Sequence, residues 1–230
     1  MDSSSVPGTS KVWARRLLRC GMAAGPMFVT VFLAEGAVRG GYRPLRHPVS
    51  SLALGSRGWI QTANFAMCAA SVLGGAVGLA SAGEPEVGRA TSTLIGAAGA
   101  GLIASALFTT DPVSGYPPGT PEALTQPTRT GIAHNLSALP VFLGLSGAAL
   151  VTARRSWRAG QHSFAGYSAG TGVGALTTVV LAGAGFGQAP RLVNLAGLFQ
   201  RISIITAFTW LSALSFRALR RMSSIAAPMD

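Results

Sequence analysis

The stretch GIAHNLSALPVFLGLSGAALVT, residues 131–152, decides the fold class of this protein. It is 22 residues long and contains no Asp, Glu, Lys or Arg. A helix of about 20 apolar residues is long enough to cross the hydrocarbon core of a bilayer. The stretch therefore predicts a membrane-spanning helix.

Five further stretches have similar length and composition. They are Met22–Val38, Trp59–Ala80, Ala90–Thr109, Phe164–Phe186 and Leu192–Phe216. The connections between them are too short to fold as a separate soluble domain. We expect an all-α, polytopic membrane protein built as a six-helix bundle, and we divide the chain into a basic N-terminal segment (residues 1–20), a membrane domain (21–216) and a C-terminal tail (217–230).

Composition supports this class. Charged residues make up 11% of the chain and the mean hydropathy is +0.43, whereas soluble domains carry about 25% charged residues. The net charge of +11 does not indicate nucleic-acid binding, because the basic residues lie between apolar runs and form no basic face with interleaved aromatics. Arginine outnumbers lysine 17 to 1, which is typical of GC-rich bacterial genomes. We therefore expect the bacterial cytoplasmic membrane.

The distribution of basic residues predicts the orientation. With the N-terminus inside, the inner segments hold eleven Lys and Arg and the outer segments hold six, so the positive-inside rule puts both termini in the cytoplasm. The first span lacks a small-x-small cleavage site, and we expect it to be retained. Four of the outer basic residues are Arg39, Arg43, Arg46 and Arg57. They either bind the anionic group of a ligand through guanidinium forks or contact lipid headgroups.

Small residues recur at a spacing of four in two spans. Gly74 and Gly78 lie in the second span, and Gly166, Gly170 and Gly174 lie in the fifth. This spacing lines one helix face with small residues and lets helix backbones approach closely. We expect both sets to pack against neighbouring helices.

The strongly polar side chains of the spans gather in their outer halves. They are Glu35, Gln61, Asn64, Asp111, His134, Asn135, Asn194, Gln200 and Arg201. Ionisable groups inside a membrane cost about 2.5–3.5 kcal/mol each on insertion scales, so they usually face the bundle interior and indicate function. The pattern predicts a polar cavity in the outer half of the bundle.

Three of these residues are candidate catalytic groups: Asp111, Glu35 and His134. Asp111 is expected to close the third span before Pro112, with its carboxylate near His134. By depth, Glu35 and Arg201 can meet in one cavity, either as functional groups or as a buried ion pair that fixes helix packing. A metal bound by Glu35, Asp111 and His134 is conceivable, but no local ligand spacing supports it. We predict no metal and no cofactor.

The connection GGYRPLRHPVSSLALG, residues 40–55, combines prolines, arginines and apolar residues. Its apolar residues predict that it folds back over the mouth of the bundle. Substrate-binding candidates come from this segment and from the outer parts of the spans, where aromatic rings would stabilise a cationic intermediate. They are Arg46, His47, Ser50, Trp59, Asn64, Phe108, Phe142, Gln200 and Arg201.

Several short motifs carry a resemblance to a known family. They are YRPLRHPVSSLALG (42–55), GWIQTANF (58–65), TDP (110–112) and GIAH (131–134). Together they resemble the signature of a family of small six-span membrane proteins known as domain of unknown function 998. The resemblance covers most of the chain and implies a six-helix fold. It also supports Arg46, His47, Ser50, Asp111 and His134 as site positions, and it implies no activity.

Three functions fit these features. The first is a membrane enzyme that performs acid–base chemistry on a lipophilic, isoprenoid-type substrate, with proton-initiated terpene cyclisation as one example. The second is a proton-coupled small-molecule transporter with a relay of ionisable residues, although the strong polar groups stop halfway across. The third is an accessory or lipid-binding membrane subunit whose polar layer is structural. The expected partners are membrane lipids and a lipophilic small molecule.

Overall fold

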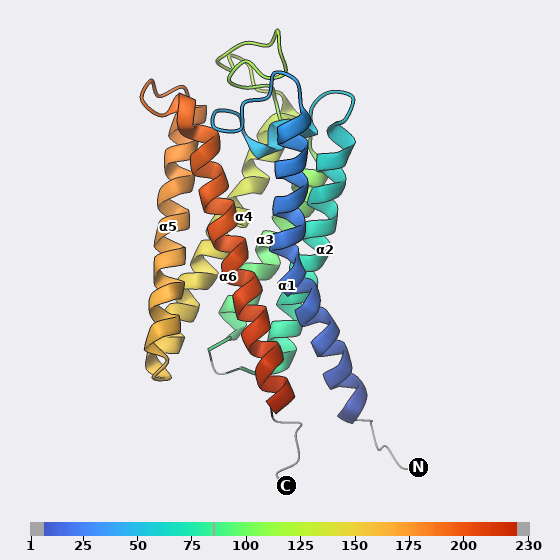
Figure 1. The fold of residues 1–230 in the computed structure, drawn as a ribbon, viewed down its shortest axis with the longest axis vertical. Helices are drawn as coiled ribbons and strands as arrows, with labels where there is room; N and C mark the ends of the chain where they lie inside the picture. Colours follow the sequence, from blue (N-terminus) through green and yellow to red (C-terminus); the bar gives the residue numbers. More distant parts are fainter. Residues whose placement is uncertain (1–6, 85, 225–230) are drawn as a thin grey trace.

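The computed structural model describes residues 7–84 and 86–224, and this part of the chain is all-helical (Figure 1). All six α-helices are long and apolar enough to cross a membrane. They are α1 (Pro7–Val38), α2 (Gly58–Ala82), α3 (Arg89–Leu107), α4 (Arg129–Arg158), α5 (His162–Phe186) and α6 (Ala196–Ser224). Two short 3-10 helices, η1 (Val49–Ala53) and η2 (Val193–Leu195), complete the described elements. The predicted six-helix membrane fold is confirmed.

Each helix packs against the next along the chain, and α6 returns to pack against α1. The start of α1 and the end of α6 lie at the lower end of Figure 1, which we call the termini end. The α1–α2 connection, residues 39–57, and the α3–α4 connection, residues 108–128, lie at the opposite end. We call residues 39–57 the lid, residues 108–128 the outer loop, and this end of the bundle the lid end.

Helix boundaries depart from the expected spans at two informative places. Helix α1 begins at Pro7, so most of the basic N-terminal segment continues the first span as helix. Helix α3 ends at Leu107, so the expectation that Asp111 closes this span is wrong. Thr109 and Thr110 are β-branched, and a residue that precedes proline, as Asp111 does, is disfavoured in the α conformation. Asp111 therefore lies in the outer loop.

Glycines bring α1 and α2 together in the half of the bundle near the termini end. A Cβ built on Gly75 would lie 2.7 Å from the Gly21 Cα, and one on Gly78 would lie 2.8 Å from the Leu18 nitrogen. The backbones of the two helices approach this closely only because no side chain intervenes. The close packing predicted for Gly78 is confirmed.

The glycines of α5 behave differently. A Cβ on Gly166, Gly170 or Gly174 would meet no heavy atom within 4 Å. Helix α5 packs on its neighbours α4 and α6 with another face, which includes the buried Ser168, Gly172 and Ala175. The prediction that Gly166, Gly170 and Gly174 pack against a neighbouring helix is therefore wrong.

Candidate functional site

The lid folds back onto the bundle, as its apolar residues predict. Tyr42, His47, Val49 and Leu52 are buried, and η1 forms the part of the lid that lies against the helices. The Gln200 side chain of α6 accepts a hydrogen bond from the Val49 N–H at 2.8 Å. The lid thus packs against the helices and covers this end of the bundle.

Arg201 of α6 holds the lid from below. Its Nη1 donates to the backbone oxygens of Pro44 at 2.5 Å, His47 at 3.1 Å and Gly197 at 2.9 Å. Its Nη2 donates to the Tyr42 hydroxyl at 2.5 Å. A buried guanidinium is tolerated when hydrogen bonds satisfy its donors. Here three carbonyl oxygens and one hydroxyl accept hydrogen bonds from the two terminal nitrogens of the guanidinium.

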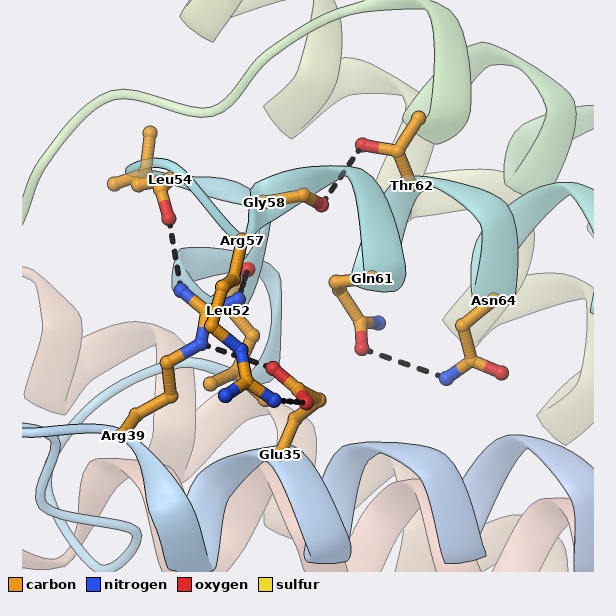
Figure 2. A network of polar contacts seen from close by, with 9 residues as sticks. All are labelled: Glu35, Arg39, Leu52, Leu54, Arg57, Gly58, Gln61, Thr62 and Asn64. Atoms are coloured by element: carbon orange, nitrogen blue, oxygen red, sulfur yellow. Dashed lines mark hydrogen bonds and ion pairs between the residues drawn. The ribbon is translucent and has the colours of Figure 1, made fainter.

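Glu35 has different partners (Figure 2). Its carboxylate accepts from Arg39 Nε at 3.0 Å and from Arg57 Nη2 at 2.5 Å. Arg39 also donates to the Leu52 and Leu54 carbonyls at 3.0 Å each, so this cluster ties the lid to the end of α1. The predicted meeting of Glu35 with Arg201 is wrong. Arg39 directly follows the last residue of α1 and lies four residues after Glu35, a spacing that brings the two side chains together, so Arg39 pairs with Glu35 instead.

His47 links the lid to the outer loop. Its Nδ1 accepts from the Arg43 N–H at 2.9 Å, and its Nε2 lies 3.1 Å from the Ser114 carbonyl oxygen. A ring that accepts at Nδ1 and donates at Nε2 is neutral. Burial lowers the pKa of His47, as do the nearby Arg46 and Arg43, while the Ser114 hydrogen bond opposes the shift.

Two tyrosines flank the His47 ring. Its centroid lies 5.5 Å from that of Tyr42 and 5.2 Å from that of Tyr116 in the outer loop. Burial raises the pKa of the Tyr42 hydroxyl, although the adjacent Arg201 opposes this. Around His47, the lid and the outer loop therefore meet through neutral polar and aromatic contacts, and the ion pair between Arg46 and Glu122 joins them at the surface.

A cavity of about 660 Å³ lies below the lid. All six helices line it, for example through Phe28, Phe65, Leu102, Phe142, Phe186 and Ile204. Its polar lining residues are Ser50, Ser105, Thr110, Asp111, His134, Asn135, Gln188 and Gln200. The cavity is thus mainly apolar, with a few hydrogen-bonding groups.

The cavity opens sideways between α4 and α5. Three of its lining residues are more than half exposed: Leu139 at 52%, Leu143 at 53% and Val180 at 67%. In Figure 1, α4 lies beside α5 near the termini end and apart from it near the lid end. Because these exposed residues belong to helices that can span a membrane, the opening faces the region that lipid occupies.

Asp111 braces the start of α4. Its carboxylate accepts from the Thr128 N–H at 2.9 Å and from the Thr128 hydroxyl at 2.7 Å. Thr128 in turn caps α4 by accepting from the Gly131 N–H at 3.0 Å. A Cβ on Gly131 would overlap the Asp111 carboxylate. The glycine therefore lets a negative charge lie at the positive end of the helix dipole.

His134 lies in the second turn of α4 and lines the cavity. Its Nδ1 lies 2.8 Å from the Phe108 carbonyl oxygen. A carbonyl only accepts, so Nδ1 carries the proton of this hydrogen bond. In the neutral ring, Nε2 is then the proton acceptor. The His134 ring also packs edge-on against the Phe65 ring, at a centroid distance of 6.0 Å, and this contact further fixes its orientation.

The structure divides the predicted site residues into two groups. Those that line the cavity are Ser50, Asp111, His134, Phe142 and Gln200, whereas Glu35, Arg46, His47, Trp59, Asn64, Phe108 and Arg201 do not. Trp59 is 68% exposed at the start of α2. Asn64 is fully buried and donates to the Phe28 carbonyl at 3.1 Å. Phe108 contributes its carbonyl to His134 rather than its ring to the cavity.

Sequence reasoning missed the α5 wall of the cavity and a cluster at the termini end. The α5 wall, which includes Val179, Val180 and Gly183, is apolar and carries no polar signal. The termini-end cluster consists of Glu84 and Glu86 with Arg217, Arg221 and Gln161. Two of only seven acidic residues fall in the short α2–α3 connection, while the segments that end the fourth and sixth spans are rich in arginine, and this was the available signal.

No group of three or more His, Cys, Asp or Glu that could hold a metal occurs among residues 7–84 and 86–224. Comparison with known proteins gives a family for this chain. Residues 22–217 match the family described as "Protein of unknown function (DUF998)". No curated protein and no solved structure matches the chain. The family match spans well over half of the sequence and agrees with the motifs of the lid, so this six-helix membrane protein belongs to the DUF998 family.

Proposed function

We propose that this protein takes up a lipophilic molecule sideways from the bilayer into the cavity, and that His134 transfers a proton to or from the polar end of that molecule. The observation that carries the proposal is the opening between α4 and α5, through which the cavity meets lipid.

The size and lining of the cavity support binding. Small-molecule sites commonly measure about 300–1,000 Å³, with mostly apolar walls and a few placed polar groups. This cavity, at about 660 Å³, has that character. An isoprenoid-type chain would contact the apolar walls along its length, with its polar end toward His134, Asn135 and Gln200.

His134 is the best-supported proton carrier. Its ring is fixed by the Phe108 carbonyl, and its other nitrogen can accept a proton. The Asp111 carboxylate is engaged by Thr128 at the start of α4, and Glu35 lies outside the cavity between two arginines. Acid–base isomerisation or cyclisation of an isoprenoid is the reaction class that His134 would serve.

Blocking the opening tests the binding step. A Cβ on Gly183 meets nothing within 4 Å, yet this glycine lines the cavity. Gly183→Leu should therefore narrow the opening without disturbing the packing. Gly174→Leu is the matched control, because it lies on the same helix, is equally free of neighbours and does not line the cavity.

The readout is photocrosslinking in lipid nanodiscs with a diazirine-bearing farnesol, followed by peptide mapping. We expect label on the cavity-lining segments of α4 and α5 in the wild type and in Gly174→Leu, and at least tenfold less in Gly183→Leu. Equal labelling of all three proteins would overturn the binding proposal.

A second comparison tests the proton-transfer step. Solvent extracts of purified wild type and His134→Gln are compared by mass spectrometry after expression in the same cells. We expect the variant to retain a co-purifying lipophilic compound that the wild type has converted. If the extracts are identical while farnesol labelling persists, His134 transfers no proton to the bound molecule. The protein is then better interpreted as a lipid-binding membrane subunit.

The proposal includes the membrane orientation. We propose that the termini end faces the cytoplasm of a bacterial cell, because the basic residues concentrate there. A reporter inserted after Arg57 in the lid should report the outer side. A cytoplasmic signal from that position would reverse the orientation and assign the cavity to the other leaflet.

A further inference from the structure

We propose that the ligand of this cavity carries an uncharged polar end, such as an alcohol, a ketone or a quinone carbonyl, and not a phosphate, diphosphate, carboxylate or ammonium group. This inference rests on the proposed function and names the chemical class of its ligand.

The first observation is the charge of the walls. The chain contains 18 Lys and Arg, yet none of them lines the cavity. The ionisable lining residues are Asp111 and His134. A phosphate in this place would meet no guanidinium or ammonium group and would lie near a carboxylate.

The second observation is that four arginines in or beneath the lid are already engaged, whereas Arg43, the remaining lid arginine, is exposed and does not line the cavity. Arg39 and Arg57 pair with Glu35, and Arg46 pairs with Glu122 and donates to Asn194. Both terminal nitrogens of Arg201 already donate hydrogen bonds to oxygens of the lid and of α6. Swinging any of these toward the cavity would break the contacts that hold the lid.

The energetic consequence favours a neutral group. Burying an ionised group away from water without a partner is strongly unfavourable, even after the surroundings relax. A phosphate would carry that cost here. An ammonium group would meet one carboxylate whose two oxygens already accept from Thr128. A hydroxyl or carbonyl carries no such penalty once it is hydrogen-bonded.

The polar lining suits a neutral oxygen. The Gln200 Oε1 is used by the Val49 N–H, which leaves its NH₂ group as a donor. Asn135 and the Ser50 hydroxyl can donate or accept, and the His134 ring can accept at Nε2. These groups can satisfy both the hydrogen and the lone pairs of an alcohol, or the lone pairs of a carbonyl.

The test compares probes that differ only at the polar end. Diazirine-bearing farnesol, farnesyl phosphate and farnesylamine are crosslinked to the protein in nanodiscs at equal mole fraction. The signal counted is the α4 and α5 labelling that Gly183→Leu removes and Gly174→Leu retains. We expect farnesol to exceed each of the other two by at least tenfold.

The outcomes separate this inference from the proposed function. If farnesyl phosphate or farnesylamine labels the cavity as well as farnesol does, the inference is wrong while lateral binding stands. If no probe gives labelling that depends on Gly183, lateral binding itself fails.

A positively charged residue placed in the cavity wall tests whether the lack of positive charge is what excludes a phosphate. Asn135 lines the cavity and is exposed enough to accept a longer side chain. Asn135→Arg should raise farnesyl phosphate labelling relative to farnesol by about tenfold, because the phosphate gains a partner. Asn135→Gln, which adds length without charge, should leave the ratio unchanged. A ratio that is the same in Asn135→Arg and Asn135→Gln would show that missing positive charge does not exclude the phosphate.

Discussion

The two ends of the bundle both bury carboxylates against arginines, but the pairs connect different parts of the chain. At the lid end, Glu35 binds Arg39 and Arg57, the farther of which is 22 residues away. At the termini end, Glu84 and Glu86 bind Arg221, which lies 137 and 135 residues away. The first set shapes one connection, whereas the second joins the α2–α3 connection to the last helix.

This difference matches the shape of each end. Near the termini end, α1 and α2 touch through glycines, and the acidic pair holds α6 in place. Near the lid end, the ion pairs fix the lid but do not draw α4 toward α5, and the opening of the cavity remains between these two helices. The buried termini-end pairs thus join segments far apart in the sequence, whereas the buried Glu35 pairs shape only the lid.

The largest expected effect comes from breaking the termini-end pairs. Glu86→Leu should lower the free energy of unfolding by about 3 kcal/mol, because Arg217 and Arg221 lose a partner whose side chain is almost fully buried. Chemical unfolding in detergent micelles measures it. Glu122→Leu is the control: it also pairs with an arginine, but its side chain is 65% exposed, so the loss should stay below about 1 kcal/mol. Equal losses would contradict the distinction between the two pairs.

The next effect compares the packing of the two halves. Gly75→Ala should cost about 1–3 kcal/mol, since the new methyl group would overlap the Gly21 backbone. Gly183→Ala should change stability by less than about 0.5 kcal/mol, because it meets nothing within 4 Å. Both are measured by the same unfolding assay. A costly Gly183→Ala would mean that the lid half is closed rather than open.

The lid itself should loosen when Arg201, whose hydrogen bonds hold it to α6, is replaced. Ser51 belongs to the lid and is fully buried against the bundle, so a Ser51→Cys thiol should react slowly with maleimide in a Cys20→Ser, Cys68→Ala background. Adding Arg201→Met should raise that rate about tenfold, which corresponds to about 1.4 kcal/mol of lost hydrogen bonding. A Ser56→Cys thiol, at an exposed lid position, should react equally fast with and without Arg201. An unchanged rate at Ser51→Cys would show that Arg201 does not hold the lid.

The smallest effect is a pH dependence of the lid end. The pKa of His47 is lowered by burial and by Arg43 and Arg46, with Glu122 and the Ser114 hydrogen bond opposing; Tyr42, Tyr116 and Arg201 also lie around it. As the pH falls past the ordinary value of 6.5, the unfolded chain takes up this proton first, so stability falls until the folded-state pKa is reached.

The thermal midpoint between pH 8 and pH 5 reports this dependence. The wild type should lose more stability on acidification than His47→Asn, because the variant lacks this titration while every other group is shared. Parallel curves would mean that His47 does not contribute to the pH dependence.

The sequence predicted the spans well because a run of apolar residues is a local property. Residues 131–152 specify a membrane helix whatever surrounds them, and the structure adds only two residues before this stretch and six after it. The lid was also predictable, since its apolar residues had to be buried somewhere.

The direction in which a side chain points from its helix was harder to predict. Glu35 and Arg201 were matched by depth alone, but Arg39 and the lid carbonyls lie nearer to them. In the same way, the spacing of Gly166, Gly170 and Gly174 fixes a helix face without saying whether a neighbour covers it. Which face meets which helix is decided by all six helices together.

If a ligand enters the cavity through the sideways opening between α4 and α5, as we propose, that route decides how occupancy of the cavity is set. A pocket that meets lipid samples the mole fraction of its ligand in the bilayer, and aqueous solubility does not enter. Exchange is then a two-dimensional encounter within the leaflet on the lid side of the bundle. A compound confined to the opposite leaflet would have to flip across the bilayer before this protein could reach it, so the transbilayer distribution of lipids would govern its supply.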